Sequence, residues 1–276
     1  MGRRTKPGRV ARRPSAGALA AVAAIALAVV GLALFASPGQ TKQTDRYVAL
    51  GDSYAVGTGA SSTRDGYVRR FGAWLARRGV NDVANVAVGG ETTTSLVEGG
   101  QLDRGLDAID DGGSTTRAVT IDIGVNELLA PGCKDGVTGP ECPARADLEE
   151  IFGQVRSALD AEAPGGRLYV VGLFTPFPSA PAPAREALDF LLQGSDGRVD
   201  CAGTGAAIGM NDLLACLGAK VGATYVSTSG AFREGGADLV AEDGLHPSDR
   251  GHALIAELLE RAVDHPTPVR NAGALR

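Results

Sequence analysis

A serine near the start of the chain and a histidine near its end have the chemistry of a nucleophile and its base. Ser53 lies two residues after Gly51, in a Gly-Asp-Ser-Tyr sequence that follows a short apolar segment. His246 follows Asp243 by three residues and directly precedes a proline. A carboxylate so placed in a turn can hold Nδ1 of the imidazole and leave Nε2 to take a serine proton. We therefore predict Ser53 as nucleophile, His246 as general base and Asp243 as the residue that orients the base.

These residues also have a purely structural interpretation. Gly-Asp-Ser turns are common because Asp and Ser bond to nearby backbone groups, and His246 lies where a residue can cap the following helix. The other two histidines are placed differently, since His252 lies within an amphipathic helical pattern and His265 in a polar tail. We expect both of them to be packed or solvent-facing and not to act as the base.

Short apolar segments alternate with helical patterns along most of the chain. Helical periodicity runs up to Arg78, recurs over residues 148–159 and returns in a last helix over residues 247–263. Strands that alternate with helices indicate a parallel sheet, and ligands bind at the carboxyl ends of such strands. Ser53 follows the first strand directly and is expected at that edge. The predicted strands cover residues 47–50, 83–88, 118–123, 168–173 and 224–227.

A long excursion is expected between the last two strands. It contains four prolines between Pro176 and Pro183 and then a glycine-rich stretch from Gly194 to Gly218. Long loops of this kind often act as lids or binding loops. Three of its glycines superficially resemble a nucleotide-binding fingerprint, but no strand precedes them and their spacing is wrong, so we predict a flexible loop. These glycines are Gly203, Gly205 and Gly209.

The N-terminal residues are typical of a targeting segment. Six Lys and Arg residues and no acid precede an uncharged stretch of 21 residues from Ala16 to Ala36. Roughly 20 apolar residues span a bilayer and roughly 7 to 15 form a signal-peptide core, so length favours an uncleaved anchor. The many alanines and the Leu34-Phe35-Ala36 site favour a cleaved signal peptide, and both alternatives stay open. Either way the basic flank stays in the cytoplasm and the domain is extracytoplasmic. We expect a basic and apolar segment over residues 1–37, a linker over 38–45, one domain over 46–268 and a polar tail over 269–276.

The charge of the domain argues against a nucleic-acid partner. Without its first 37 residues the chain carries 21 Lys and Arg against 32 Asp and Glu, a formal charge of −11. Such a surface repels phosphate backbones. The aromatic content of 5% also provides no stacking platform for single strands.

The four cysteines predict disulfides, because their number is even and the leader directs the chain to an oxidising compartment. Three pairings are possible, and we favour the nearest-neighbour bridges Cys133–Cys142 and Cys201–Cys216, which close short loops. Zinc is the alternative, but the chain has no Cys-x-x-Cys and no His near either pair. We expect neither a metal nor a cofactor.

Four motifs in the expected order resemble those of the GDSL/SGNH hydrolases. They are Gly51-Asp52-Ser53-Tyr54, Asn85-Val86-Ala87-Val88-Gly89-Gly90-Glu91-Thr92, Gly124-Val125-Asn126-Glu127 and Asp243-Gly244-Leu245-His246. Together they span nearly the whole domain and are far more specific than any one motif alone. The resemblance implies a compact α/β fold, a flavodoxin-like three-layer α/β/α sandwich around a five-stranded parallel sheet.

The resemblance also implies an activity and a set of oxyanion donors. The negative oxygen formed by attack of Ser53 would be met by the backbone N–H groups of Ser53 and Gly90 and by the Asn126 side-chain amide. The implied reaction is cleavage of carboxylic esters in acylated lipids, sugars or small esters through an acyl-enzyme. We expect a monomer that contacts the membrane only through residues 16–36, if these are not cleaved.

Two residues depart from the usual family pattern. Tyr54 stands where the family usually has Leu, and Glu127 stands where it usually has Asp. We expect Tyr54 to alter only local packing, whereas the longer Glu127 side chain leaves open how the Asn126 loop is held.

Two other functions remain alternatives. An acyltransferase would use the same residues with a sugar or lipid hydroxyl in place of water. A non-catalytic surface binding protein could retain the fold, and Glu127 is the only feature that favours it. The complete set of Ser53, Asp243 and His246 argues against that alternative, because a binding module needs no aligned nucleophile and base.

Overall fold

One parallel sheet organises the domain. The computed structural model describes residues 44–266, apart from residues 130, 134–135, 138 and 195–207. Within this part five strands pair in parallel in the order β2-β1-β3-β4-β5. They are β1 (Thr44–Gly51), β2 (Val80–Asn85), β3 (Ser114–Asp122), β4 (Arg167–Val171) and β5 (Thr224–Val226). All five predicted strands are therefore confirmed, although β1 and β3 begin three and four residues earlier than predicted and β2 is shifted by three residues toward the N-terminus.

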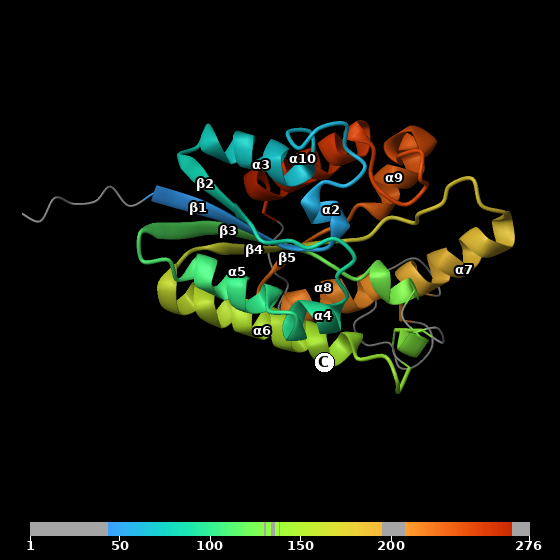
Figure 1. Cartoon of the computed structure of the whole chain (residues 1–276), viewed down its shortest axis with the longest axis horizontal. Helices are drawn as coiled ribbons and strands as arrows, with labels where there is room; N and C mark the ends of the chain where they lie inside the picture. Colours follow the sequence, from blue (N-terminus) through green and yellow to red (C-terminus); the bar gives the residue numbers. More distant parts are fainter. Residues whose placement is uncertain (1–43, 130, 134–135, 138, 195–207, 267–276) are drawn as a thin grey trace, which may run out of the picture. The chain divides into compact units, whose positions relative to one another are not determined.

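Helices cover both faces of the sheet, which confirms the predicted three-layer architecture (Figure 1). One layer contains α3 (Tyr67–Ala76) and α10 (Asp249–Asp264), which pack against each other. The opposite layer contains α4 (Thr93–Glu98), α5 (Gln101–Ile109), α6 (Ala144–Glu162) and α8 (Met210–Lys220). The remaining elements are α2 (Ser53–Val56), α7 (Ala182–Gln193), α9 (Ser229–Gly235) and the 3-10 turns η1 (Asn126–Leu129), η2 (Pro131–Cys133) and η3 (Ala237–Leu239).

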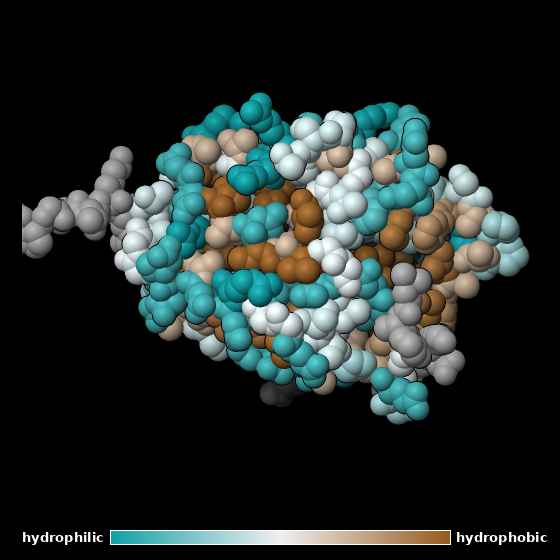
Figure 2. All heavy atoms as spheres, in the orientation of Figure 1, coloured by the Kyte–Doolittle hydropathy of each residue, from teal (hydrophilic) through white to brown (hydrophobic). Residues whose placement is uncertain are grey.

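The central strands are apolar at successive positions because helices cover them on both sides. All four residues from Tyr47 to Leu50 in β1 are fully buried. The edge strand β2 is only partly covered, with Val83 and Ala84 half-buried. On the face drawn in Figure 2, apolar surface gathers between the two helical layers and hydrophilic surface covers the helices. The core therefore lies along the sheet, and β1, an interior strand between β2 and β3, leads into Ser53.

The prediction of one long flexible loop between β4 and β5 is wrong for two of its segments. Residues 182–193 form α7, which starts next to Pro181 and has a proline in its first turn, a position that tolerates proline. Residues 210–220 form α8, where Met210, Leu213, Leu214 and Leu217 are buried. Their helical spacing was obscured by the surrounding glycines. Gly209 caps α8, whereas Gly203 and Gly205 lie outside the described residues.

Most of the predicted N-terminal organisation lies outside the described residues, which begin at Thr44. The targeting segment over residues 1–37, most of the 38–45 linker and the 269–276 tail therefore remain predictions. β1 already includes the last two residues of the predicted linker. Among the helices of the described part, none is both long enough and apolar enough to cross a bilayer.

The structure joins Cys133 to Cys142 in a disulfide with a Cα–Cα distance of 4.6 Å, as predicted. The second predicted bridge involves Cys201, which lies outside the described residues, so that bridge remains a prediction. Within the described part no cysteine is free.

Gly51 at the end of β1 is required by its conformation and by its neighbour. Its φ is +146°, and a Cβ there would lie 2.1 Å from the backbone oxygen of Asp122 in β3. We expect Gly51→Ala to lower the free energy of unfolding by several kcal/mol, because the clash is with backbone that cannot move without separating two strands. Urea unfolding measures this effect.

The matched control is Gly153→Ala within α6, where a Cβ meets open space. This change is expected to stabilise the protein slightly, because Ala is favoured over Gly in a helix by about 1 kcal/mol. Equal stability of the two variants would contradict the argument about Gly51.

Candidate active site

The structure brings Ser53, His246 and Asp243 together. Ser53 is the first residue of α2 and is 7% exposed, while His246 lies in the connection between η3 and α10. The Oγ atom of Ser53 lies 3.0 Å from Nε2 of His246, and Nδ1 of His246 lies 2.6 Å from Oδ2 of Asp243. If Nδ1 carries the ring proton and donates to Asp243, Nε2 is free to accept the hydroxyl proton of Ser53.

The turn from Asp243 to His246 is shaped by the same carboxylate that holds the ring. Oδ1 of Asp243 accepts the backbone N–H groups of Leu245 and His246, at 2.9 and 3.0 Å. Burial alone would raise the pKa of Asp243, but hydrogen bonds from the His246 ring and from these two N–H groups lower this pKa to about 2. Asp243 is therefore an ionised partner for the imidazole, although its side chain is 47% exposed.

The predicted oxyanion donors come from three loops at the same edge of the sheet. The Ser53 N–H is the first of α2, and the first N–H groups of a helix have no intrahelical acceptor. Gly90 is exposed with φ +79°, in the loop after β2. Asn126 begins η1 after β3, and its Nδ2 donates to the backbone oxygen of Glu91 at 2.7 Å. The second hydrogen of that amide remains available for another acceptor.

Two buried polar residues that the sequence analysis missed join the nucleophile turn to the Gly90 loop. Gln101 is fully buried, and its amide bonds both backbone groups of Gly51, at 2.7 Å to the nitrogen and 3.0 Å to the oxygen. Its Nε2 also donates to Oε1 of Glu91 at 3.2 Å. The sequence alone does not single out this glutamine as part of the site, because its hydrogen-bond partner Gly51 lies 50 residues away.

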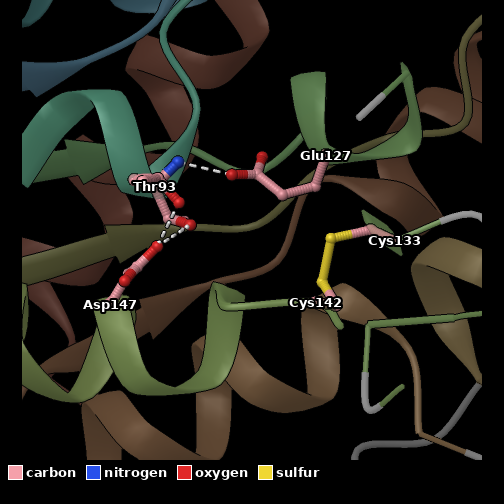
Figure 3. The surroundings of a disulfide bond; sticks show 6 residues. Thr93, Glu127, Cys133, Cys142 and Asp147 are labelled. Atoms are coloured by element: carbon pink, nitrogen blue, oxygen red, sulfur yellow. Dashed lines mark hydrogen bonds between the residues drawn. A yellow bond between two sulfur atoms is a disulfide. The ribbon is translucent and has the colours of Figure 1, made fainter. Parts of the chain in front are cut away.

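Glu127 holds the Asn126 loop, which answers the question raised by its departure from the family pattern. Its carboxylate is buried and accepts the backbone N–H of Thr93, the first residue of α4 (Figure 3). Burial raises the pKa of Glu127, while the Thr93 hydrogen bonds lower it. The Thr93 hydroxyl in turn donates to Asp147 of α6 at 3.0 Å. Glu127 therefore connects the loop after β3 to the helix that follows the Gly90 loop.

Two carboxyl groups close to Ser53 are fully buried, that of Asp52, the N-cap of α2, and that of Asp122, the last residue of β3. Oδ1 of Asp52 accepts the Tyr54 N–H at 2.9 Å, and the backbone N–H of Asp52 donates to the Asp122 backbone oxygen at 3.0 Å. Burial raises the pKa of Asp122 to about 7, while a contact with the Tyr67 hydroxyl opposes this. Burial, followed by the charge of Asp122, also raises the pKa of Asp52 well above its usual value.

The other two histidines lie apart from Ser53. His252 is fully buried, accepts the Tyr67 N–H at Nδ1 and donates from Nε2 to the Thr58 backbone oxygen at 3.0 Å. Burial lowers its pKa, so it is a neutral, packed residue, as expected. His265 is exposed at the end of α10. Among the described residues, no group of three His, Cys, Asp or Glu side chains could hold a metal ion.

A cavity of about 460 Å³ lies between α7, α9 and the segment after β4. Phe174 and Phe232 form part of its wall, and their rings stack at 3.9 Å. Phe174 also stacks on Tyr54 at 5.2 Å, but neither Ser53 nor His246 lines the cavity. The cavity is thus distinct from the contact between Ser53 and His246.

The sequence matches the model of the GDSL-like lipase/acylhydrolase family over residues 49–254, and the chain belongs to this family. The predicted family and the predicted fold are thereby confirmed. No curated protein matches the chain.

Solved structures show the same fold. The lipase Lip_vut3 from a goat rumen metagenome is 20% identical with a TM-score of 0.53, and the match covers 79% of this chain and 97% of that one. TesA is 19% identical with a TM-score of 0.51 over 79% of this chain and 97% of that one. The extracellular lipase of Streptomyces rimosus is 23% identical with a TM-score of 0.50 over 79% and 99% of the two chains.

The raised pKa of Asp122 has a consequence for stability. The folded protein binds the proton of the Asp122 carboxyl group more tightly than the unfolded chain does. The protonated carboxyl group therefore contributes to the free energy of unfolding fully below about pH 4, and this contribution is lost as the pH rises through about 7. Asn cannot ionise, so the Tm of Asp122→Asn relative to wild type is expected to increase by several degrees between pH 5 and pH 8. Thermal unfolding at a series of pH values measures this difference.

The exposed Asp103 of α5 provides the control, since Asp103→Asn should show no such trend. If the Tm difference between Asp122→Asn and wild type stays constant with pH, the raised pKa of Asp122 is refuted.

Proposed function

We propose that this protein is a serine esterase that cleaves carboxylic ester bonds through an acyl-enzyme. The observation that carries the proposal is the continuous set of contacts from Ser53 Oγ to His246 Nε2 and from His246 Nδ1 to Asp243 Oδ2, at 3.0 and 2.6 Å. Membership of the GDSL-like lipase/acylhydrolase family supports ester cleavage as the type of reaction.

The reaction begins when Ser53 Oγ attacks the carbonyl carbon of the ester. Its proton passes to Nε2 of His246, and Asp243 stabilises the imidazolium that forms. The tetrahedral intermediate collapses, His246 gives the proton to the departing alkoxide, and the acyl group remains on Ser53. Water then attacks the acyl-enzyme with His246 again as base, which releases the acid and restores the hydroxyl.

The oxyanion of each tetrahedral intermediate is assigned to the N–H groups of Ser53 and Gly90 and to the Asn126 amide. Gly90 has no side chain to obstruct the carbonyl group, and the Asn126 amide donates without carrying a charge. The contacts of Gln101 and Glu127 support this assignment, because they connect the three loops from which the donors come.

An apolar substrate group is the second part of the proposal. In the described part of the chain, Val56, Val88, Phe177 and Phe190 are the large apolar side chains that are exposed, and three of them lie on segments of the site. Val56 ends α2, and Val88 donates its N–H to the backbone oxygen of Gly51 at 3.1 Å. Phe177 donates its N–H to the backbone oxygen of Gly244, next to Asp243. Exposed apolar side chains on three segments that adjoin the site favour an ester with an apolar acyl group.

The location outside the cytoplasm is also proposed. The Cys133–Cys142 bridge supports an oxidising compartment, where disulfides persist. The basic and apolar residues 1–37 would direct the chain there as a signal peptide or an anchor.

Ser53→Ala is expected to abolish hydrolysis of p-nitrophenyl acetate, with kcat lowered by at least about a thousandfold, as for other triad nucleophiles. The change removes only the attacking oxygen, so circular dichroism and Tm should stay close to wild type. Ser157→Ala, at an exposed serine of α6, is the control with unchanged turnover. Undiminished hydrolysis by Ser53→Ala would refute the mechanism.

Two measurements separate the alternatives. A fluorophosphonate should label wild type but not Ser53→Ala, whereas a folded wild-type protein that resists labelling would favour a binding protein. Product analysis with an added alcohol acceptor distinguishes water from a hydroxyl compound as the group that resolves the acyl-enzyme.

Phe177→Ala is expected to raise KM for p-nitrophenyl octanoate at least about fivefold, equivalent to about 1 kcal/mol, because an apolar contact with the acyl chain is lost. KM for p-nitrophenyl acetate should change less than about twofold, because its acyl group is too short to reach the ring. Phe190→Ala, at an exposed phenylalanine of α7, is the matched control. An equal effect of Phe177→Ala on both esters would argue against this contact.

A further inference from the structure

Tyr54 directly follows Ser53 and occupies the position where the family usually has leucine. The side chain is almost completely buried, at 1% exposure. It was expected to alter only local packing, and the structure shows that this expectation is incomplete. The Tyr54 hydroxyl donates a hydrogen bond to the backbone oxygen of Leu245 at 2.8 Å.

The acceptor of this bond is the residue immediately before His246. Among the described residues, two hydrogen bonds join α2 to the 241–247 connection, one from the Tyr54 hydroxyl and the other between Ser53 and His246. The remaining bonds of the turn run within it or to Phe177. Leucine at position 54 could not make the first of the two bonds, because it has no donor.

The ring of Tyr54 also contacts the base. It lies edge-on to the His246 ring, with centroids 5.9 Å apart and an interplanar angle of 77°. The Tyr54 ring also stacks on Phe174, which stacks on Phe232 of α9. The ring is thus in contact with the base and with a stack of two aromatic side chains, which limits the directions in which the hydroxyl can point.

The Tyr54 hydroxyl also remains a donor at any pH used for an assay. Burial raises its pKa well above the ordinary value, and the nearby carboxylates of Asp52, Asp122 and Asp243 raise it further. Ionisation of Tyr54 therefore does not remove this hydrogen-bond donor at those pH values.

We propose that Tyr54 is a positioning residue for the base: its hydroxyl holds the Leu245 carbonyl so that the following imidazole stays in line with the neighbouring nucleophile. The proposal rests on the esterase function proposed above. One residue would then connect both reacting groups, since its backbone adjoins Ser53 and its side chain holds the turn that contains His246.

Tyr54→Phe tests the proposal, because it keeps the ring contacts and removes only the hydroxyl. We expect kcat for p-nitrophenyl acetate to fall roughly three- to tenfold, the effect of losing one neutral hydrogen bond, while KM stays within about twofold of wild type. Amide hydrogen exchange over residues 241–247 should become faster. Tyr54→Leu, which restores the residue usual in the family, also lacks the donor and should show the same changes if Tyr54→Phe does not fold.

The matched control is Tyr47→Phe. Tyr47 is a fully buried tyrosine whose hydroxyl bonds the Thr120 hydroxyl at 2.7 Å inside the sheet. Its loss should lower Tm by a similar amount without changing kcat or the exchange of residues 241–247. A purely structural role of Tyr54 would make the two variants behave alike.

The outcomes separate this proposal from the esterase function. Wild-type kcat in Tyr54→Phe overturns the positioning role, even if hydrogen exchange changes. If wild-type protein hydrolyses no ester, the esterase function fails, and hydrogen exchange alone then decides whether Tyr54 holds the turn. Unchanged exchange over residues 241–247 would overturn the proposal in that case.

Discussion

The site depends on one geometric constraint, which is that all five parallel strands end at the same edge of the sheet. Gly51 and Asp122 are paired at the ends of β1 and β3, and the approach of their backbones excludes any side chain at position 51. Ser53 follows β1 at this edge, and Gly90 and Asn126 lie in the segments that leave the same edge after β2 and β3. The hydroxyl and the imidazole can therefore meet although 193 residues separate them in sequence.

Side chains behind this edge connect its loops to one another. Gln101 bonds the backbone of Gly51 and the Glu91 carboxylate, while Glu127 caps α4 from the loop after β3. Most of these groups are buried, so each would be costly to leave without a partner. Such buried networks favour a single arrangement of the loops, which suits a site whose donors come from separate segments.

The sequence was sufficient to predict the strands and to single out three distant residues that the structure brings into contact. Residues 47–50 form an apolar run because helices cover β1 on both faces, and Ser53, Asp243 and His246 stand in short local motifs. Helix α8 was missed because glycines flank its apolar positions. Gln101 and the Tyr54 hydroxyl could not be assigned from the sequence, because their partners lie 50 and 191 residues away and depend on tertiary packing.

The separation of Ser53 from His246 also bears on how the chain matures. Contacts between distant segments carry a large loop-closure entropy and tend to form late in folding. During synthesis from the N-terminus the serine emerges with the first strand, whereas its imidazole emerges just ahead of the terminal helix α10. A chain that stops before the connection between η3 and α10 contains Ser53 but lacks the imidazole that contacts it. The contact between Ser53 and His246 can therefore form only when synthesis of the domain is nearly complete.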